Sequence, residues 1–170
     1  MDAYLAGGCF WCMEKPYGDV SGVTFVESGY CGGVEEAPTY EQVKAQKTDH
    51  RETVHIVFDP EIISFEKLLK VYFYNIDPFD GGGQFIDRGR SYTCAVYYTD
   101  DMQKSVAEDC ISRIEKKYGK KVCVSLEKYE KFRRAEEYHQ HYAEKNADEY
   151  AEEYRISGRA DIAESDRVKL

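Results

Sequence analysis

Two cysteines at positions 9 and 12 stand where a helix is expected to begin. Gly7 and Gly8 turn the chain directly before Cys9. A thiol at a helix start faces unpaired backbone N–H groups and the positive end of the helix dipole, and both favour the thiolate. Cys12 lies on the same helical face, at a Cα separation of about 5–6 Å, which a disulfide can span. One thiol can therefore attack an electrophile, and the other can resolve what forms.

Other interpretations of this pair stay open at the level of residue types. Free cysteines pack well as small buried hydrophobes, so Cys9 and Cys12 could simply belong to the core. A zinc-binding module would need further ligands, but no second CxxC is present, and His139 and His141 lie far away in sequence.

A thioredoxin-like thiol-disulfide oxidoreductase using the same two cysteines is the nearest rival. Its usual CxxC motif opens a long helix, whereas Pro16 and Gly18 are expected to end this helix early. Bulky Phe10 and Trp11 between the cysteines favour an apolar pocket for a small group over a surface that exchanges protein disulfides.

Composition and charge exclude several partners. The formal net charge is −9, and the basic residues are dispersed among acidic ones. This distribution argues against nucleic acid and against an anionic membrane as partners. The sequence shows neither a signal-peptide pattern nor an apolar run of about 18 residues. We therefore expect a cytoplasmic protein whose six cysteines are reduced.

Hydrophobic periodicity predicts an alternation of strands and helices. We expect strands over residues 3–6, 23–30, 53–58, 92–98 and 122–126. A short helix at 9–15 is followed by amphipathic helices at 65–76 and 101–118, with Ser64 and Asp100 as N-caps and Gly119 as a C-cap. Residues 77–91 are expected to form a long loop, and the C-terminal third reads as helical and charged.

Several of these strands adjoin without a crossover helix between them, which favours an α+β fold over a doubly wound parallel sheet. We expect a two-layer sandwich in which a mixed, largely antiparallel central sheet is flanked by helices around a ferredoxin-like core. No repeat or linker interrupts the sequence, so residues 1–170 are predicted to form one domain, with a C-terminal extension at about 143–170.

The segment Gly8-Cys9-Phe10-Trp11-Cys12 strongly resembles the GCFW signature of the A-type peptide methionine sulfoxide reductases, in the variant with a second cysteine after the tryptophan. The likeness continues in order through GYCGG at 29–33, PTYEQV at 38–43, HRETV at 50–54, FDP at 58–60, DP at 77–78, GGQFIDRG at 82–89 with Tyr92, and AEEYHQ at 135–140. It covers nearly the whole chain.

The resemblance implies an enzyme that reduces the S epimer of methionine sulfoxide, free or in oxidised proteins, without a metal or a bound cofactor. Cys9 is then the nucleophile that attacks sulfur. Phe10 and Trp11 would receive the methyl group, and Asp87 would orient the substrate backbone. Thioredoxin is the implied reductant, and we expect the enzyme to be a monomer.

Tyr30, Glu52 and Tyr92 match the positions that hold and protonate the sulfoxide oxygen. The chemistry requires such groups, because the oxygen must take up a proton before the S–O bond breaks. A carboxyl group among aromatic rings is desolvated, which raises its pKa and keeps Glu52 protonated near neutral pH.

After attack, Cys9 should carry a sulfenic acid that a second thiol converts into a disulfide. Cys12 is the favoured resolving residue, and Cys31 is the alternative. Many relatives carry recycling cysteines in a C-terminal tail, but no cysteine follows Cys123 in this sequence.

Overall fold

A six-stranded mixed sheet organises the computed structural model, which describes residues 1–170. Its strands are β1 (Asp2–Ala6), β2 (Val23–Cys31), β3 (Arg51–Phe58), β6 (Ala95–Tyr98), β7 (Ser125–Lys128) and β8 (Arg133–Arg134), in the order β7-β6-β1-β3-β2-β8. Only the β6–β7 pair is parallel. The predicted mixed and largely antiparallel sheet of an α+β fold is confirmed.

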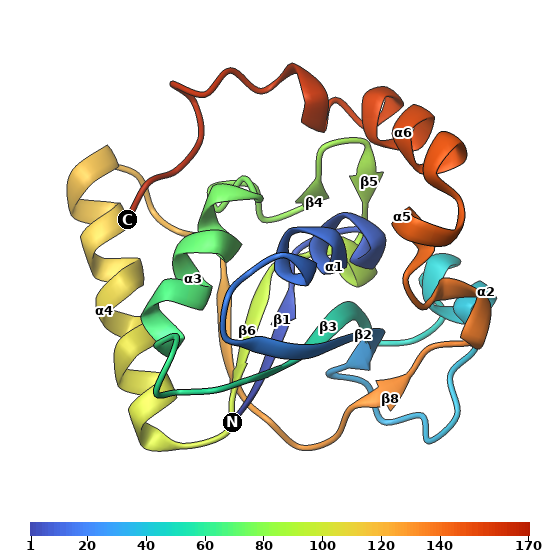
Figure 1. Ribbon diagram of the computed structural model, residues 1–170, viewed down its shortest axis with the longest axis horizontal. Helices are drawn as coiled ribbons and strands as arrows, with labels where there is room; N and C mark the ends of the chain where they lie inside the picture. Colours follow the sequence, from blue (N-terminus) through green and yellow to red (C-terminus); the bar gives the residue numbers. More distant parts are fainter.

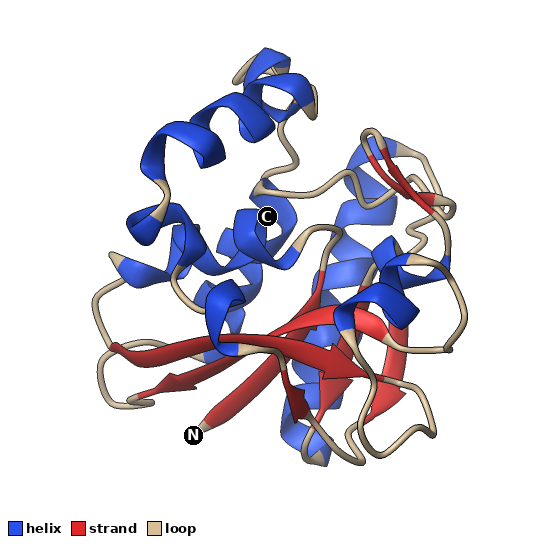
Figure 2. Ribbon diagram, turned by 90° about the vertical axis from the view of Figure 1, so that its right-hand side faces the viewer, coloured by secondary structure: helices blue, strands red, loops and turns tan.

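Helices cover one face of this sheet (Figure 2). The longer ones are α1 (Phe10–Gly18), α3 (Phe65–Tyr74), α4 (Asp101–Tyr118) and α6 (Ala147–Ile156), and the short ones are α2 (Tyr40–Lys44) and α5 (Tyr142–Lys145). Three single 3-10 turns, η1 (Arg90–Tyr92), η2 (Glu137–His139) and η3 (Arg159–Asp161), complete the set. None of these helices combines the length and the apolar character that a membrane crossing requires.

The main core lies between the sheet and α1, α3 and α4. It holds 27 buried side chains, among them Leu5 and Val54 from the sheet, Met13 from α1, Leu68 from α3 and Ile114 from α4. Successive strand residues face opposite sides. The other face of the sheet therefore carries a separate, smaller cluster beneath the loop between β7 and β8.

The predicted helix boundaries agree with local capping chemistry. The Ser64 side chain accepts a hydrogen bond from Lys67 N, and Asp100 accepts one from Gln103 N. Gly119 ends α4 in the left-handed conformation, with φ of 64°. These interactions depend on neighbouring residues, which is why the sequence predicted them.

The largest differences from the predictions are at α1, β6, β7 and the loop at 77–91. Helix α1 continues through Pro16 to Gly18, because a proline removes only one N–H from the last turn while Met13 and Tyr17 remain packed in the core. The strand expected from Tyr92 begins only at Ala95.

The last predicted strand, 122–126, is found at Ser125–Lys128, where it pairs with β6. The loop expected at 77–91 contains a two-stranded hairpin, β4 (Gly83–Gln84) with β5 (Asp87–Arg88).

The C-terminal segment returns over the helical layer. Figure 1 shows α5 and α6 beside α1, and the chain after α6 running across the top of the molecule toward α4. Tyr142 of α5 stacks on Trp11 of α1, with ring centroids 3.8 Å apart, and Tyr150 of α6 packs against Cys12. This segment therefore covers the start of α1.

Candidate active site

Cys9 is the N-cap residue of α1, as the sequence predicted. Its backbone has φ of −53° and ψ of 121°, and its carbonyl accepts hydrogen bonds from Cys12 N at 3.1 Å and Met13 N at 3.2 Å. Gly8 before it has φ of 85°, a left-handed conformation that glycine adopts without strain. The turn thus delivers the Cys9 side chain to the positive end of the helix.

Glu52 approaches the same helix end from β3. Its Oε2 accepts a hydrogen bond of 3.0 Å from Phe10 N, one of the unpaired N–H groups of α1. Only 2% of the residue is exposed, and this burial raises the pKa of Glu52 to about 8, against the opposing effect of the Phe10 hydrogen bond. The carboxyl group is therefore largely protonated at neutral pH, in agreement with the prediction from its aromatic surroundings.

A cavity of about 230 Å³ connects these groups. Six of the residues singled out from the sequence line it: Cys9, Trp11, Cys12, Glu52, Asp87 and Tyr92. They come from β1–α1, β3, the β4–β5 hairpin and η1, so segments separated by more than eighty residues meet at one place.

Phe10 and Tyr30 lie behind this cavity and do not line it. Both are 1% exposed, and their rings are 5.9 Å apart. Tyr30 is the register partner of Glu52 across β2 and β3, but its hydroxyl donates to Glu136 at 2.9 Å. The Phe10 ring packs near Trp11, and the backbone N–H of Phe10 donates the hydrogen bond to Glu52.

His139 fills the space behind the same rings. It is 1% exposed, and its ring lies 5.0 Å from Phe10, 5.5 Å from Trp11 and 4.3 Å from Tyr40. Burial lowers the pKa of His139 to about 4, so its ring is neutral at physiological pH. His139 is therefore a buried, neutral ring that supports the aromatic residues of the site.

The two thiols interact directly. A hydrogen bond to Cys12, with burial adding to it, raises the pKa of Cys9. The same bond and the positive charge of Arg159 lower the pKa of Cys12, although burial opposes them. The pKa of Cys12 is therefore shifted down and that of Cys9 up, whereas the helix N-terminus alone predicted a thiolate at Cys9.

Cys31 occupies the opposite face of the sheet from Cys9. It follows Tyr30 in β2, so the two side chains point to opposite sides. Its neighbours are Tyr4 and Tyr97 in the second cluster, and burial raises its pKa to about 12. The β2–β3 pair stands between this thiol and the cavity.

The other residues of the cavity lining were not identified as site residues from the sequence: Tyr40, Lys44, Ile86, Glu153, Ile156, Ser157 and Arg159. Tyr40 lies within the matched PTYEQV segment, so the resemblance offered a signal for it. Arg159 lies in the predicted C-terminal extension, where no local pattern distinguishes it from the other charged residues.

No group of three or more histidine, cysteine, aspartate or glutamate side chains in the chain is arranged to hold a metal ion. The pair Cys9–Cys12 lies instead in a cavity lined by aromatic rings, by three carboxyl groups (Glu52, Asp87 and Glu153) and by the cations of Lys44 and Arg159. These surroundings define the site of a thiol oxidoreductase that handles a small, partly apolar group.

Comparison with known proteins gives one family. The family model described as peptide methionine sulfoxide reductase matches residues 1–169. The chain is 48% identical to the peptide methionine sulfoxide reductase MsrA of Bacillus velezensis, over 92% of this chain and 90% of that protein. It is 47% identical to MsrA 2 of Staphylococcus aureus, over 96% and 93%.

Solved structures agree with this assignment. Reduced Mxr1 from Saccharomyces cerevisiae superposes with a TM-score of 0.82 at 28% identity, over 86% of each chain. Methionine sulfoxide reductase A of Corynebacterium diphtheriae gives 0.77 at 26% identity, over 86% of this chain and 74% of that one. The chain belongs to the peptide methionine sulfoxide reductase family and is an oxidoreductase of the A type.

Proposed function

We propose that this enzyme reduces the S epimer of methionine sulfoxide through a sulfenic acid on Cys9. One observation carries the proposal: Cys9 and Glu52 meet at a single cavity, where the N–H that follows Cys9 holds the carboxyl group. The site therefore combines a sulfur nucleophile with an acid that is protonated at neutral pH.

The first step breaks the S–O bond. The Cys9 sulfur attacks the sulfoxide sulfur and forms an S–S bond, while Glu52 donates a proton to the sulfoxide oxygen. The hydroxyl then passes from the substrate sulfur to the Cys9 sulfur, and the S–S bond breaks with its electron pair remaining on the methionine sulfur. The products are methionine and Cys9 sulfenic acid, so the sulfoxide is reduced by two electrons and the Cys9 sulfur is oxidised by two. The proton that Cys9 loses to Cys12 ultimately returns to Glu52, which leaves the overall charge unchanged.

The second step uses Cys12. The Cys12 sulfur attacks the sulfur of Cys9 sulfenic acid and forms the disulfide, while the S–O bond breaks and the hydroxyl takes up a proton from Glu52 to leave as water. Cys12 is three residues from Cys9 in the same helical turn and lines the same cavity, whereas Cys31 lies across the sheet. We therefore retain Cys12 as the resolving residue over Cys31.

A dithiol must then reduce the Cys9–Cys12 disulfide, and we propose thioredoxin for this step. Mxr1, whose fold this chain shares, has also been solved in complex with Trx2. Thiol–disulfide exchange returns two thiols to the enzyme and leaves the disulfide on the reductant.

Substrate contacts follow from the cavity lining. Trp11 offers an apolar wall for the methyl group, and Asp87 accepts hydrogen bonds from the substrate backbone, free or within a protein. Tyr92 faces the cavity and can donate to the sulfoxide oxygen. Tyr30 lies opposite Glu52 and would join it only after releasing Glu136.

The remaining proposals concern the whole protein. One domain is supported by a core that draws on residues from Ala3 to Val168. A monomer is supported by a site built from a single chain, with no bound metal or cofactor needed for any step. A cytoplasmic location would keep Cys9 and Cys12 reduced between turnovers.

Separated sulfoxide epimers test the reaction. Reduced wild-type enzyme with thioredoxin, thioredoxin reductase and NADPH should consume the S epimer and leave the R epimer, whereas Cys9→Ser should consume neither under any reductant. Equal rates on the two epimers would contradict the proposed stereochemistry, and residual turnover by Cys9→Ser would remove Cys9 as the nucleophile.

A further inference from the structure

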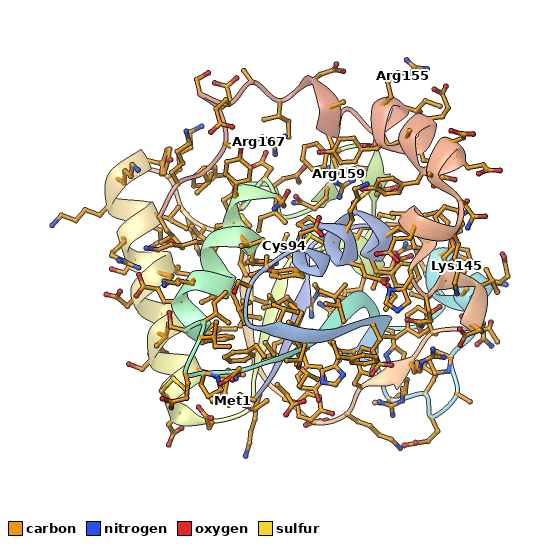
Figure 3. The ribbon with its side chains drawn as sticks, in the orientation of Figure 1. Met1, Cys94, Lys145, Arg155, Arg159 and Arg167 are labelled. Atoms are coloured by element: carbon orange, nitrogen blue, oxygen red, sulfur yellow. The ribbon has the colours of Figure 1, made fainter.

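Arg159 brings a buried positive charge to the thiol pair from the C-terminal segment. Figure 3 shows this side chain pointing from η3 toward α1, while Arg155 at the outer side of α6 points away from the molecule. Only 2% of Arg159 is exposed, and it lines the same cavity as Cys9 and Cys12.

The contacts of the guanidinium fix its place above the active-site turn. Its Nη2 lies 3.4 Å from the carbonyl of Gly7, and its plane lies over the Phe85 ring at 4.5 Å. A Cβ atom added to Gly8 would lie 2.6 Å from Nη2, so the group rests directly against the residue before Cys9.

These contacts do not satisfy the guanidinium. Its one carboxylate partner is Asp87, at 3.4 Å from Nη1, and its Nε has no hydrogen-bond partner. A buried cation is costly unless charges and hydrogen bonds compensate it. The site thus leaves capacity for a second negative charge, and a thiolate of the neighbouring pair can supply it.

We propose that Arg159 is a positioning residue of the active site, whose charge holds a thiolate on the Cys9–Cys12 pair. The C-terminal segment is then part of the catalytic site and not only its cover. This inference rests on the proposed thiol chemistry and adds the group that supplies the thiolate at neutral pH. Consistent with it, the Arg159 charge lowers the pKa of both Cys9 and Cys12.

Other charged and titratable groups around the pair act in both directions. Those that line the cavity or contact the thiols are Glu52 from β3, Asp87 from β5, Tyr92 from η1, Tyr40 and Lys44 from α2, and Tyr150 and Glu153 from α6. Asp87 raises the pKa of Cys12, so this carboxylate opposes Arg159, and Glu52 raises the pKa of Cys9 once Glu52 itself is ionised.

The test compares Arg159→Gln with Arg155→Gln in a Cys123→Ser background. Both variants lose one positive charge, but the Arg155 side chain is 66% exposed and pairs only with Glu152. Cys123 is the exposed cysteine that is removed. Burial raises the pKa of Cys31 and Cys94 to about 12 and raises that of Cys110, so these thiols stay protonated.

The measurement is the rate of iodoacetamide alkylation of the Cys9–Cys12 peptide between pH 5 and 10, followed by mass spectrometry. The pH at which the alkylation rate is half of its maximum is the midpoint. Arg159→Gln should raise this midpoint by about one to two pH units, which slows alkylation at pH 7 about ten- to a hundredfold. Arg155→Gln should leave it in place. An unchanged midpoint in Arg159→Gln, or an equal shift in both variants, overturns the proposal.

Arg159→Lys provides the second measurement if Arg159→Gln fails to fold. Lysine keeps the charge but lacks the planar fork that reaches both Asp87 and Gly7. A midpoint close to that of the wild type supports the role of the charge, and an upward shift of a unit or more contradicts it. The alkylation measurement contains no sulfoxide and is therefore independent of the reductase assay. An unchanged midpoint would overturn the role of Arg159 without affecting the proposed reductase activity, and an inactive reductase would not prevent the midpoint from being measured.

Discussion

At the scale of single residues, burial decides the chemistry of Glu52. The strand position alone would predict a solvated carboxylate, but the aromatic neighbours predicted a desolvated one, and β3 buries it against α1. Cys9, Trp11 and Asp87 were likewise found at the cavity. The hydrogen bond that ties Tyr30 to Glu136 joins residues 106 positions apart, so no local pattern revealed it.

Glu52→Gln should lower the rate of sulfoxide reduction by about 10²- to 10⁴-fold, because glutamine cannot protonate the oxygen. The wild type should lose activity as Glu52 ionises, near its pKa of about 8, because the ionised carboxylate has no proton to donate. The wild-type rate constant should fall as pH rises through that value, and the variant should lack this limb. Rapid-mixing kinetics at pH 6 to 9.5 measure the rate constants of the wild type and the variant. If Glu52→Gln reduces sulfoxide at the wild-type rate, Glu52 is not the acid.

Cys12→Ser should keep one round of reduction and lose thioredoxin-driven turnover, because the Cys9 sulfenic acid then has no resolving thiol. Dimedone labelling of Cys9, detected by mass spectrometry, reports the trapped acid. Cys123→Ser is the matched control, since this thiol is exposed and does not line the cavity. If Cys31→Ser, and not Cys12→Ser, keeps one round of reduction and loses turnover, Cys31 is the resolving residue.

At the scale of elements, the turn between β1 and α1 controls the position of the nucleophile. The pair Gly7-Gly8 after a short apolar run predicted this turn. Capping side chains predicted the starts of α3 and α4. The hairpin β4–β5 and strand β8 were missed. Two-residue strands carry no periodicity, and their pairing depends on partners elsewhere in the chain.

Gly8→Ala should destabilise the enzyme by about 1–3 kcal/mol, since φ of 85° strains an L-residue. The added Cβ would also meet Arg159 Nη2 at 2.6 Å and Gln84 Cβ at 2.7 Å. Gly18→Ala at the end of α1 is the control, because nothing lies within 4 Å of its Cβ position. Urea midpoints measure both, and equal stability of the two variants would show that the turn tolerates a side chain.

At the scale of the whole molecule, the two faces of the sheet separate catalytic from structural groups. Tyr30 and Glu52 face α1, while Cys31 and Arg51 face the opposite side. There Arg51 donates to Tyr97 at 2.7 Å and to Glu127 at 2.8 Å. Alternation along β2 and β3 made this division predictable, but the return of residues 142–161 over the cavity was not, because contacts across more than a hundred residues leave no local signal.

Stability should depend on pH through Glu52. Its pKa is about 8 in the folded protein, above the ordinary value of 4.5. The group therefore contributes stability that is complete below pH 4.5 and lost as pH rises through 8. Between pH 6 and 9 the wild type should lose about 2–3 kcal/mol that Glu52→Gln does not lose. Urea unfolding of both proteins at the two pH values measures the difference, and parallel losses would mean that Glu52 is not buried as an acid.

The central claim is that Cys9 takes the oxygen and Cys12 resolves the product. Its most direct test is a single turnover of reduced wild-type enzyme with excess S-methionine sulfoxide and no reductant, followed by methionine quantification and disulfide mapping. We predict about one methionine per chain and a Cys9–Cys12 disulfide. The absence of methionine, or a mapped disulfide other than Cys9–Cys12, would contradict the account.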